Sequence, residues 1–204
     1  MTVKIFWHIA WLGLLLPFSF ASAQQTQPKH PSSAATNAGD AAKKEAAAEV
    51  ARLGKMIVGT WDLSGTSEAS TERPKVRHDT GRSIIKYGPG RLSLMEDFRM
   101  HGDSGELFAI GTFWWDAQAH GFRTMFCETR DPSGCSVYDG LGHWEGANLV
   151  NRWVFEDNGK RTVTKQVVEE ATPNEFIATF YNGDGDATLK KSYTYKHTRT
   201  AQAQ

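Results

Sequence analysis

The sequence predicts an all-β protein: an antiparallel up-and-down β-barrel of roughly nine or ten strands, preceded by a short N-terminal helix. Two observations predict this fold class. After Trp61 the apolar residues alternate with a period near two, and clusters of Gly, Asn, Asp and Pro separate the alternating segments. After Leu53 no helical period of useful length remains. A sheet of this size without other cover folds over or closes, and closure removes its exposed edges.

Three segments illustrate the strand pattern. Residues 105–115 are apolar on both faces, which indicates a strand that lines the interior and is covered outside. In an earlier segment the charged Glu96 lies on the same face as Leu94 and Phe98. Residues 157–160 read Asp-Asn-Gly-Lys, a hairpin signal, because Asn-Gly tolerates the positive φ of a type I′ turn. Sequential hairpins of this kind favour the up-and-down barrel.

Composition narrows the classes of partner. The chain has 204 residues, 40% of them hydrophobic, which suits one globular domain with accessory segments. Lys plus Arg (23) equals Asp plus Glu (23), so no net field favours nucleic acid or an anionic membrane surface, and we expect no nucleic-acid binding. The 7 Trp and 11 Phe either fill a β core or line an apolar ligand cavity.

The N-terminus predicts export. Residues 1–23 contain Lys4, an apolar run that ends at Phe20, and then Ala-Ser-Ala. This is the pattern of a signal peptide cleaved before Gln24, which would place the mature protein in the periplasm or outside the cell. The alternative is an uncleaved membrane anchor. The run is short, contains Pro17 and lacks a basic stop-transfer flank, so we expect no membrane span after cleavage.

A polar segment and a helix precede the barrel. Residues 24–39 contain almost no large apolar residue and are expected to be a disordered linker. Asp40 is placed to cap a helix rich in Ala, Lys and Glu, whose Ala46, Val50 and Leu53 share one face. We expect this face to cover one end of the barrel, and docking on a partner helix is the alternative. The predicted organisation is a signal peptide (1–23), a linker (24–39), a helix (40–55), a barrel (56–198) and a flexible tail (199–204).

The two cysteines flank a turn. Cys127 and Cys135 lie on either side of residues 130–134, which are rich in turn formers. An oxidising compartment would allow them to form a disulfide across a hairpin end. The alternative is two separately buried thiols, because spacing does not fix the geometry. Their spacing matches no zinc pattern.

Several short motifs resemble a known group of barrels. Gly59-Thr60-Trp61 follows the helix and opens the first strand. Further motifs are Gly-Arg-Ser at 81–83, Phe-Trp-Trp-Asp at 113–116, Gly-His-Trp-Glu-Gly at 142–146 and Gly-Lys at 159–160. Their order resembles the lipocalin and calycin pattern. More narrowly, it resembles an uncharacterised bacterial family of exported lipocalin-like barrels, over about residues 45–198. The resemblance implies a barrel with a cavity or groove and no established reaction.

The resemblance also implies a structural role for Trp61. In lipocalin-like barrels the tryptophan of the opening motif closes one end and packs beside a basic side chain of the last strand. Trp61 matches that tryptophan, and Lys191 or Lys196 would be the basic partner.

Charged and aromatic residues within the strands suggest a ligand site. An inward-facing charge must be paired or contact a polar group of a ligand, because an isolated buried charge is very costly. Arg123 and Arg152 are the two charges we select, and solvated outward positions are the alternative for both. With four aromatic residues they would form an apolar pocket with a few polar anchors: Trp114, Trp144, Trp153 and Tyr193. Core packing is the alternative role for each tryptophan.

Three loops invite a functional interpretation. Residues 102–105 (Gly-Asp-Ser-Gly) resemble the nucleophile loop of trypsin-like proteases, but a hairpin turn is expected because no histidine has a suitable setting. Residues 182–186 resemble the start of a calcium loop, but Ala187 and Tyr193 stand where Gly and Glu are required. Residues 68–82 form a polar connection, either a lid over the barrel or a surface loop.

The histidines include no pair at a metal-binding spacing, and we expect neither a metal nor a cofactor. Some lipocalin-like barrels bind haem through a single histidine, and His143 or His197 would be the positions for it here.

Three functional hypotheses follow. The first is an exported barrel that binds a small hydrophobic or amphipathic molecule. The second is an enzyme, of a hydrolase or isomerase type, with an acid–base pair at the barrel mouth, either Glu145 with His143 or Asp116 with His120. The third is a structural or interaction module with a filled barrel. No catalytic residue is selected, and the oligomeric state is open.

Overall fold

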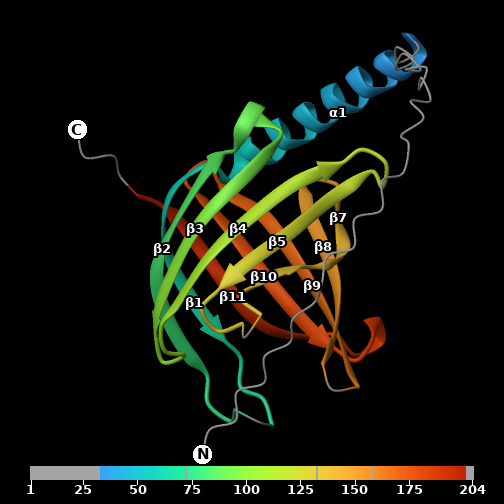
Figure 1. Cartoon of the computed structure of the whole chain (residues 1–204). Coiled ribbons are helices and arrows are strands. Elements are labelled where there is room, and N and C mark those ends of the chain that lie inside the picture. The colour runs from blue at the N-terminus through green and yellow to red at the C-terminus, as the bar shows by residue number, and fades with distance from the viewer. Residues whose placement is uncertain (1–32, 72, 132, 158, 201–204) are drawn as a thin grey trace, which may run out of the picture. The chain divides into compact units, whose positions relative to one another are not determined.

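The computed structural model describes residues 33–71, 73–131, 133–157 and 159–200. These residues form a helix followed by an antiparallel sheet (Figure 1). The elements are α1 (Ser33–Ile57), β1 (Gly59–Ser67), β2 (Arg77–Tyr87), η1 (Pro89–Arg91), β3 (Ser93–Gly102), β4 (Leu107–Asp116), β5 (Gly121–Glu128), β6 (Cys135–Val137), β7 (Asp139–Glu145), β8 (Asn148–Asp157), β9 (Lys160–Thr172), β10 (Glu175–Gly183), η2 (Asp186–Thr188) and β11 (Lys190–Arg199).

The sheet closes on itself. Apart from β6, the strands pair antiparallel with the strands before and after them in the ring: β11 returns to β1, and β5 pairs with both β4 and β7. The three-residue β6 pairs with β5 beside this ring. The predicted all-β, up-and-down antiparallel barrel with a preceding helix is therefore confirmed.

Helix α1 covers one end of the barrel. Its Val50, Leu53 and Ile57 are buried and pack in one apolar cluster with Trp61 of β1 and Phe122 of β5. Gly54 is the close-approach position, because a Cβ there would collide with the hydroxyl and ring of Tyr87. The predicted apolar face of the helix is thus the face that packs on the barrel.

The helix bounds differ from the prediction. α1 begins at Ser33, inside the predicted linker, and ends at Ile57. Asp40 therefore lies within the helix and does not cap it. Alanine has the highest helix propensity, and Ala34, Ala35 and Ala38 let the helix extend towards its N-terminus. The predicted signal peptide (1–23), the linker as far as residue 32 and tail residues 201–204 lie outside the described residues.

Trp61 has the structural position that the resemblance implies, but its basic partner is a different residue. Trp61 is 1% exposed, and its Nε1 donates a hydrogen bond of 2.8 Å to the carbonyl oxygen of Ile57. The guanidinium of Arg199 lies over its ring, because Arg199 is the residue opposite Trp61 in the β1–β11 register. The two predicted lysines point elsewhere: Lys191 pairs with Glu68 and Lys196 with Glu175.

Strand β2 begins inside the connection predicted over residues 68–82. Its inward positions include Asp79, Gly81 and Ser83, so the strand shows no apolar alternation over its first half. Asp79 is buried and satisfied, because its Oδ1 accepts a hydrogen bond from the backbone N–H of Ser104. The remaining connection, 68–76, leaves the barrel at the end where Ser67 pairs with Tyr193, away from α1.

The outer face of β4 is not covered as the sequence predicts. Leu107 and Ala109 point inward and are buried, whereas Phe108 and Ile110 point outward and are 45% and 54% exposed. These two side chains therefore lie at the surface, with the guanidinium of Arg99 near the ring of Phe108.

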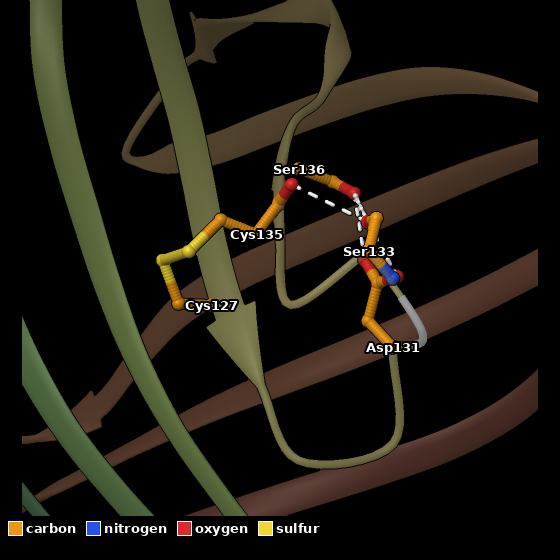
Figure 2. Close-up of a disulfide and its surroundings, with 5 residues drawn as sticks. All are labelled: Cys127, Asp131, Ser133, Cys135 and Ser136. Carbon is orange, nitrogen blue, oxygen red and sulfur yellow. Dashed lines mark hydrogen bonds between the residues drawn. A yellow bond between two sulfur atoms is a disulfide. The ribbon is translucent and has the colours of Figure 1, made fainter. Parts of the chain in front are cut away.

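Cys127 and Cys135 form a disulfide, as predicted, between directly opposite residues of β5 and β6 (Figure 2). Hydrogen bonds to the carboxylate of Asp131 hold the connecting turn together. Its Oδ1 accepts from the backbone N–H and the hydroxyl of Ser133, and its Oδ2 accepts from the hydroxyl of Ser136 (Figure 2).

Candidate functional site

A cavity of about 190 Å³ lies inside the barrel. Leu53 and Ile57 of α1 line it at the end that the helix covers. Glu128 and Phe155, near the C-terminal ends of β5 and β8, line it at the other end. Phe155 is 36% exposed, so the cavity wall reaches solvent on that side. The lining is supplied by α1 and by β2 to β5 and β8 to β11, together with Tyr138 at the junction of β6 and β7.

Polar side chains interrupt the apolar wall on β8 and β9. The Asn151 amide nitrogen donates to the Gln166 amide oxygen at 2.7 Å, and the Thr164 hydroxyl donates to the Asn182 amide oxygen at 2.9 Å. Residues 151 and 166 are direct partners in the β8–β9 register. These side chains therefore satisfy one another across neighbouring strands.

Three other cavity-lining groups have no hydrogen-bond partner among the described residues: the Thr124 hydroxyl, the indole N–H of Trp153 and Nδ1 of His197. All three residues are nine-tenths buried or more. Leaving such a group unsatisfied costs about 1–3 kcal/mol, and a ligand with matching polar atoms would recover that free energy. These groups make the cavity suited to an amphipathic molecule rather than to a pure hydrocarbon.

His197 is a neutral group at neutral pH. Its ring stacks on Phe176 with centroids 3.9 Å apart, and burial lowers its pKa to about 3. Of the two histidines considered for haem, His197 lines the cavity, whereas His143 is exposed on the other face of β7 from the buried Gly142. Among the described residues no group of three or more His, Cys, Asp or Glu side chains is placed to hold a metal ion.

The ionisable side chains of the cavity wall are acidic or neutral. Glu96 is 8% exposed, and Ser83 donates a hydrogen bond of 2.6 Å to its Oε1. Burial raises the pKa of Glu96 to about 7, because desolvation penalises the carboxylate more than the single hydrogen bond stabilises it. Burial also raises the pKa of the half-buried Glu128. No lysine or arginine is found among the described residues that line the cavity.

Tyrosines and phenylalanines form much of the remaining wall. Tyr138 packs edge-on against Trp153 and Phe155, each with centroids 5.0 Å apart, and Tyr193 stacks on Phe180 at 4.2 Å. Burial raises the pKa of Tyr138 to about 12, so its hydroxyl stays protonated at physiological pH.

The structure separates the six residues predicted to bind a ligand. Trp153 and Tyr193 line the cavity, and the other four residues do not. Trp144 lies under α1, where its Nε1 donates to Glu49 and the guanidinium of Arg52 lies 3.8 Å from its ring centroid. Trp114 is on the outward side of β4. Arg123 and Arg152 face outward as well and form ion pairs, with Asp116 at 2.7 Å and with Asp186 at 2.8 Å.

The predicted acid–base pairs do not lie in the cavity. His143 and Glu145 are exposed on the outer face of β7. Asp116 accepts hydrogen bonds from Arg123 and from the backbone of its own turn. His120 contacts Glu45 of α1 instead, with Nδ1 2.9 Å from the carboxylate.

The two suggestive loops are ordinary connections. Residues 102–105 form the turn between β3 and β4, in which Asp103 accepts a hydrogen bond from the backbone N–H of His78 and Ser104 contributes its own N–H to Asp79. Residues 182–186 join β10 to η2, and Asp186 is the ion-pair partner of Arg152. The sequence predicts a hairpin turn for the first loop and argues against a calcium site in the second.

An up-and-down antiparallel barrel with a helix over one end and a cavity inside has a lipocalin-like fold. Among solved structures, the S-type phycobiliprotein lyase CPES from Guillardia theta superposes with a TM-score of 0.50 at 10% sequence identity, covering 78% of this chain and 98% of that one. Rv2717c from M. tuberculosis also superposes with a TM-score of 0.50, at 11% identity, covering 74% and 97%. At these identities the similarity concerns the fold alone.

No family model matches the sequence, and no curated protein matches it. Among the described residues, no helix has the length and apolar character needed to cross a membrane.

Proposed function

We propose that this protein is an exported carrier that binds a small, mainly apolar molecule inside its barrel. The observation that supports it best is the combination of an interior cavity with three buried polar groups that lack a protein partner, on Thr124, Trp153 and His197. A barrel that served only as a structural module would be expected to fill this space with side chains.

The size of the cavity limits the ligand. Drug-sized ligands occupy pockets of about 300–1,000 Å³, whereas an apolar cavity of about 150 Å³ is large enough for benzene. A volume of about 190 Å³ therefore fits one aromatic ring with a short polar substituent. The indole N–H of Trp153 can only donate, so it favours a ligand that carries an acceptor.

Export is part of the proposal. Residues 1–23 have the pattern of a cleaved signal, and the Cys127–Cys135 disulfide is of a kind that persists in oxidising compartments. The intact mass of the protein recovered from the periplasm or medium of a secreting host tests this. We expect a chain that begins at Gln24, and a full-length chain retained in the cytoplasm would contradict export.

Binding is tested with the mature chain, residues 24–204, titrated with phenol and with benzene and followed by calorimetry or NMR. Thr124→Val removes the unpartnered hydroxyl at nearly constant volume. Thr112→Val makes the same change on the outward side of β4 and is the matched control. A lost hydrogen bond of about 1 kcal/mol predicts a roughly five-fold weaker affinity for phenol in Thr124→Val, with benzene unaffected. No saturable binding of either probe would contradict the carrier function.

A further inference from the structure

We propose that the cavity selects small aromatic amines bound as cations, with the carboxylate of Glu96 as the counter-ion of the ammonium group. This inference rests on the proposed function, because it names the class of ligand that the barrel carries.

The distribution of charge in the cavity wall is the first observation. The wall contains the carboxyl groups of Glu96 and Glu128 and the neutral imidazole of His197, and no lysine or arginine among the described residues. Basic side chains elsewhere on the barrel, such as Arg123 and Arg152, point outward and pair with carboxylates. An anionic ligand would therefore find no counter-ion among the lining residues, whereas a cation would find one. Arg130 lies outside this lining and interacts electrostatically with Glu128 and Tyr195.

The position of Glu96 is the second observation. Its side chain is 8% exposed and lies between Leu94 and Phe98, which belong to two different apolar clusters of the core. Among the described residues it has one hydrogen bond, from the Ser83 hydroxyl, and no ion pair with Lys, Arg or His. A carboxylate in this setting lacks a cationic partner, and an ammonium group in the cavity would supply it.

The aromatic rings near Glu96 are the third observation. Glu96 is opposite Gly111 in the β3–β4 register, and the ring of Phe126 lies so close to Gly111 that a Cβ there would be 2.9 Å from it. Phe98 and Tyr195 line the cavity on the neighbouring side, with ring centroids 5.6 Å apart. Aromatic faces attract cations through their quadrupole, so the walls that accept the ring of an arylalkylamine also favour its charge.

Three probes of similar size and different charge test the inference on the mature chain at pH 8: 2-phenylethylamine, 2-phenylethanol and 3-phenylpropionate. We expect the amine to bind at least ten-fold more tightly than the alcohol, and the carboxylate to bind least tightly. Equal affinities for amine and alcohol would overturn the inference while leaving the carrier function intact. No saturable binding of any probe would count against both.

Variants assign the preference to Glu96. Glu96→Gln keeps an acceptor for the Ser83 hydroxyl but cannot carry charge, so the amine and the alcohol should then bind about equally. Asp97→Asn is the matched control, because Asp97 is the next residue, faces outward and pairs with Arg99. It should keep the full preference. An unchanged amine preference in Glu96→Gln would overturn the inference.

The pH dependence of the wild-type protein provides a test that does not depend on a variant folding. Between pH 5.5 and 8 the affinity for the amine should rise by up to ten-fold per pH unit below pH 7, as Glu96 ionises, while the affinity for the alcohol should not rise. Of the other titratable groups in the wall, His197 and the three tyrosines, Tyr138, Tyr193 and Tyr195, do not change charge over this range. Glu128 is the remaining acid of the wall, and Glu128→Gln should leave the rise in place. Asp97, on the outer face, also acts on Glu96 and is paired with Arg99. A pH-independent amine affinity would overturn the inference.

Discussion

The guanidinium carbon of Arg199 lies 4.2 Å from the ring centroid of Trp61, and one Arg199 nitrogen donates to the carbonyl oxygen of Val58. These contacts join the last strand to the first strand and to the end of α1. Trp61 in turn packs edge-on against Phe176 with centroids 4.7 Å apart. The contact between Trp61 and Arg199 therefore connects the first and last strands of the barrel beneath the helix.

Replacing Trp61 should chiefly reduce stability. We expect Trp61→Ala to lower the free energy of unfolding by about 3–5 kcal/mol, because it removes a fully buried indole. Urea unfolding followed by circular dichroism measures the change. Trp114→Ala, on the outward side of β4, is the control and should cost much less. An unfolding midpoint that does not move in Trp61→Ala would contradict the assigned role.

Gly54 should resist a substitution that normally stabilises helices. Alanine has a higher helix propensity than glycine by about 1 kcal/mol, but a Cβ at residue 54 would collide with the ring and hydroxyl of Tyr87. Gly54→Ala should therefore destabilise the protein, by about 1–3 kcal/mol as for other overpacked sites. Gly39 lies in the same helix with nothing within 4 Å of the added Cβ, and Gly39→Ala should be neutral or stabilising by up to about 1 kcal/mol. Thermal or urea unfolding of the two variants would compare them, and equal effects would show that α1 is not docked through Gly54.

The disulfide should contribute a moderate part of the stability. Closing the short loop between Cys127 and Cys135 restricts the unfolded chain, which corresponds to about 2–3 kcal/mol for a loop of this length. We expect the double variant Cys127→Ser, Cys135→Ser to have a free energy of unfolding lower by that amount, and therefore a lower urea midpoint. Adding a reductant should shift the wild-type midpoint in the same direction and leave the variant unchanged. A wild-type midpoint that is insensitive to reductant would mean that the bridge contributes little.

The fold was predictable from the sequence because its main signals are local. Period-two alternation and turn residues appear within each hairpin, and the apolar stripe of Val50 and Leu53 appears within one helix. The start of β2 was missed because its inward residues, Asp79, Gly81 and Ser83, are polar or small. Their burial is balanced by hydrogen bonds with residues distant in the sequence, such as the one between Asp79 and Ser104.

The cavity was less predictable for a related reason. Aromatic residues occur in the cavity wall, on the outer face and under α1, so the sequence could not separate Trp153 from Trp114 or Trp144. The sequence signal that could have indicated the cavity is a polar residue on an otherwise apolar face of a strand. Glu96 was visible as a charge between Leu94 and Phe98, and Thr124 lies on the same face as Phe122 and Phe126. Glu96 lacks a cationic partner and the Thr124 hydroxyl lacks a hydrogen-bond partner among the described residues, and partners are visible only in three dimensions.

Glu96 should make stability depend on pH. Its pKa in the folded protein is about 7, above the ordinary value of 4.5, so its protonated form is the one that the folded state favours. The stabilisation from this group is therefore fully present below pH 4.5 and is lost as the pH rises through 7. A pKa difference of this size between the folded and unfolded states corresponds to roughly 3 kcal/mol in the free energy of unfolding. His197 acts in the opposite direction, because its pKa is lowered from 6.5 to about 3 and its stabilisation is lost as the pH falls through that range.

The contributions of Glu96 and His197 to the pH dependence are separated by comparing wild type with Glu96→Gln. This variant removes the contribution of Glu96 and keeps that of His197. The difference in unfolding free energy between the two proteins should change by roughly 3 kcal/mol between pH 4 and pH 8, in the direction that makes the variant relatively more stable at high pH. Asp97→Asn should show no such trend, because Asp97 faces solvent beside Arg99. If the difference between wild type and Glu96→Gln stayed constant over this range, Glu96 would have to be hydrated, and the cavity would be open to water at that point on β3.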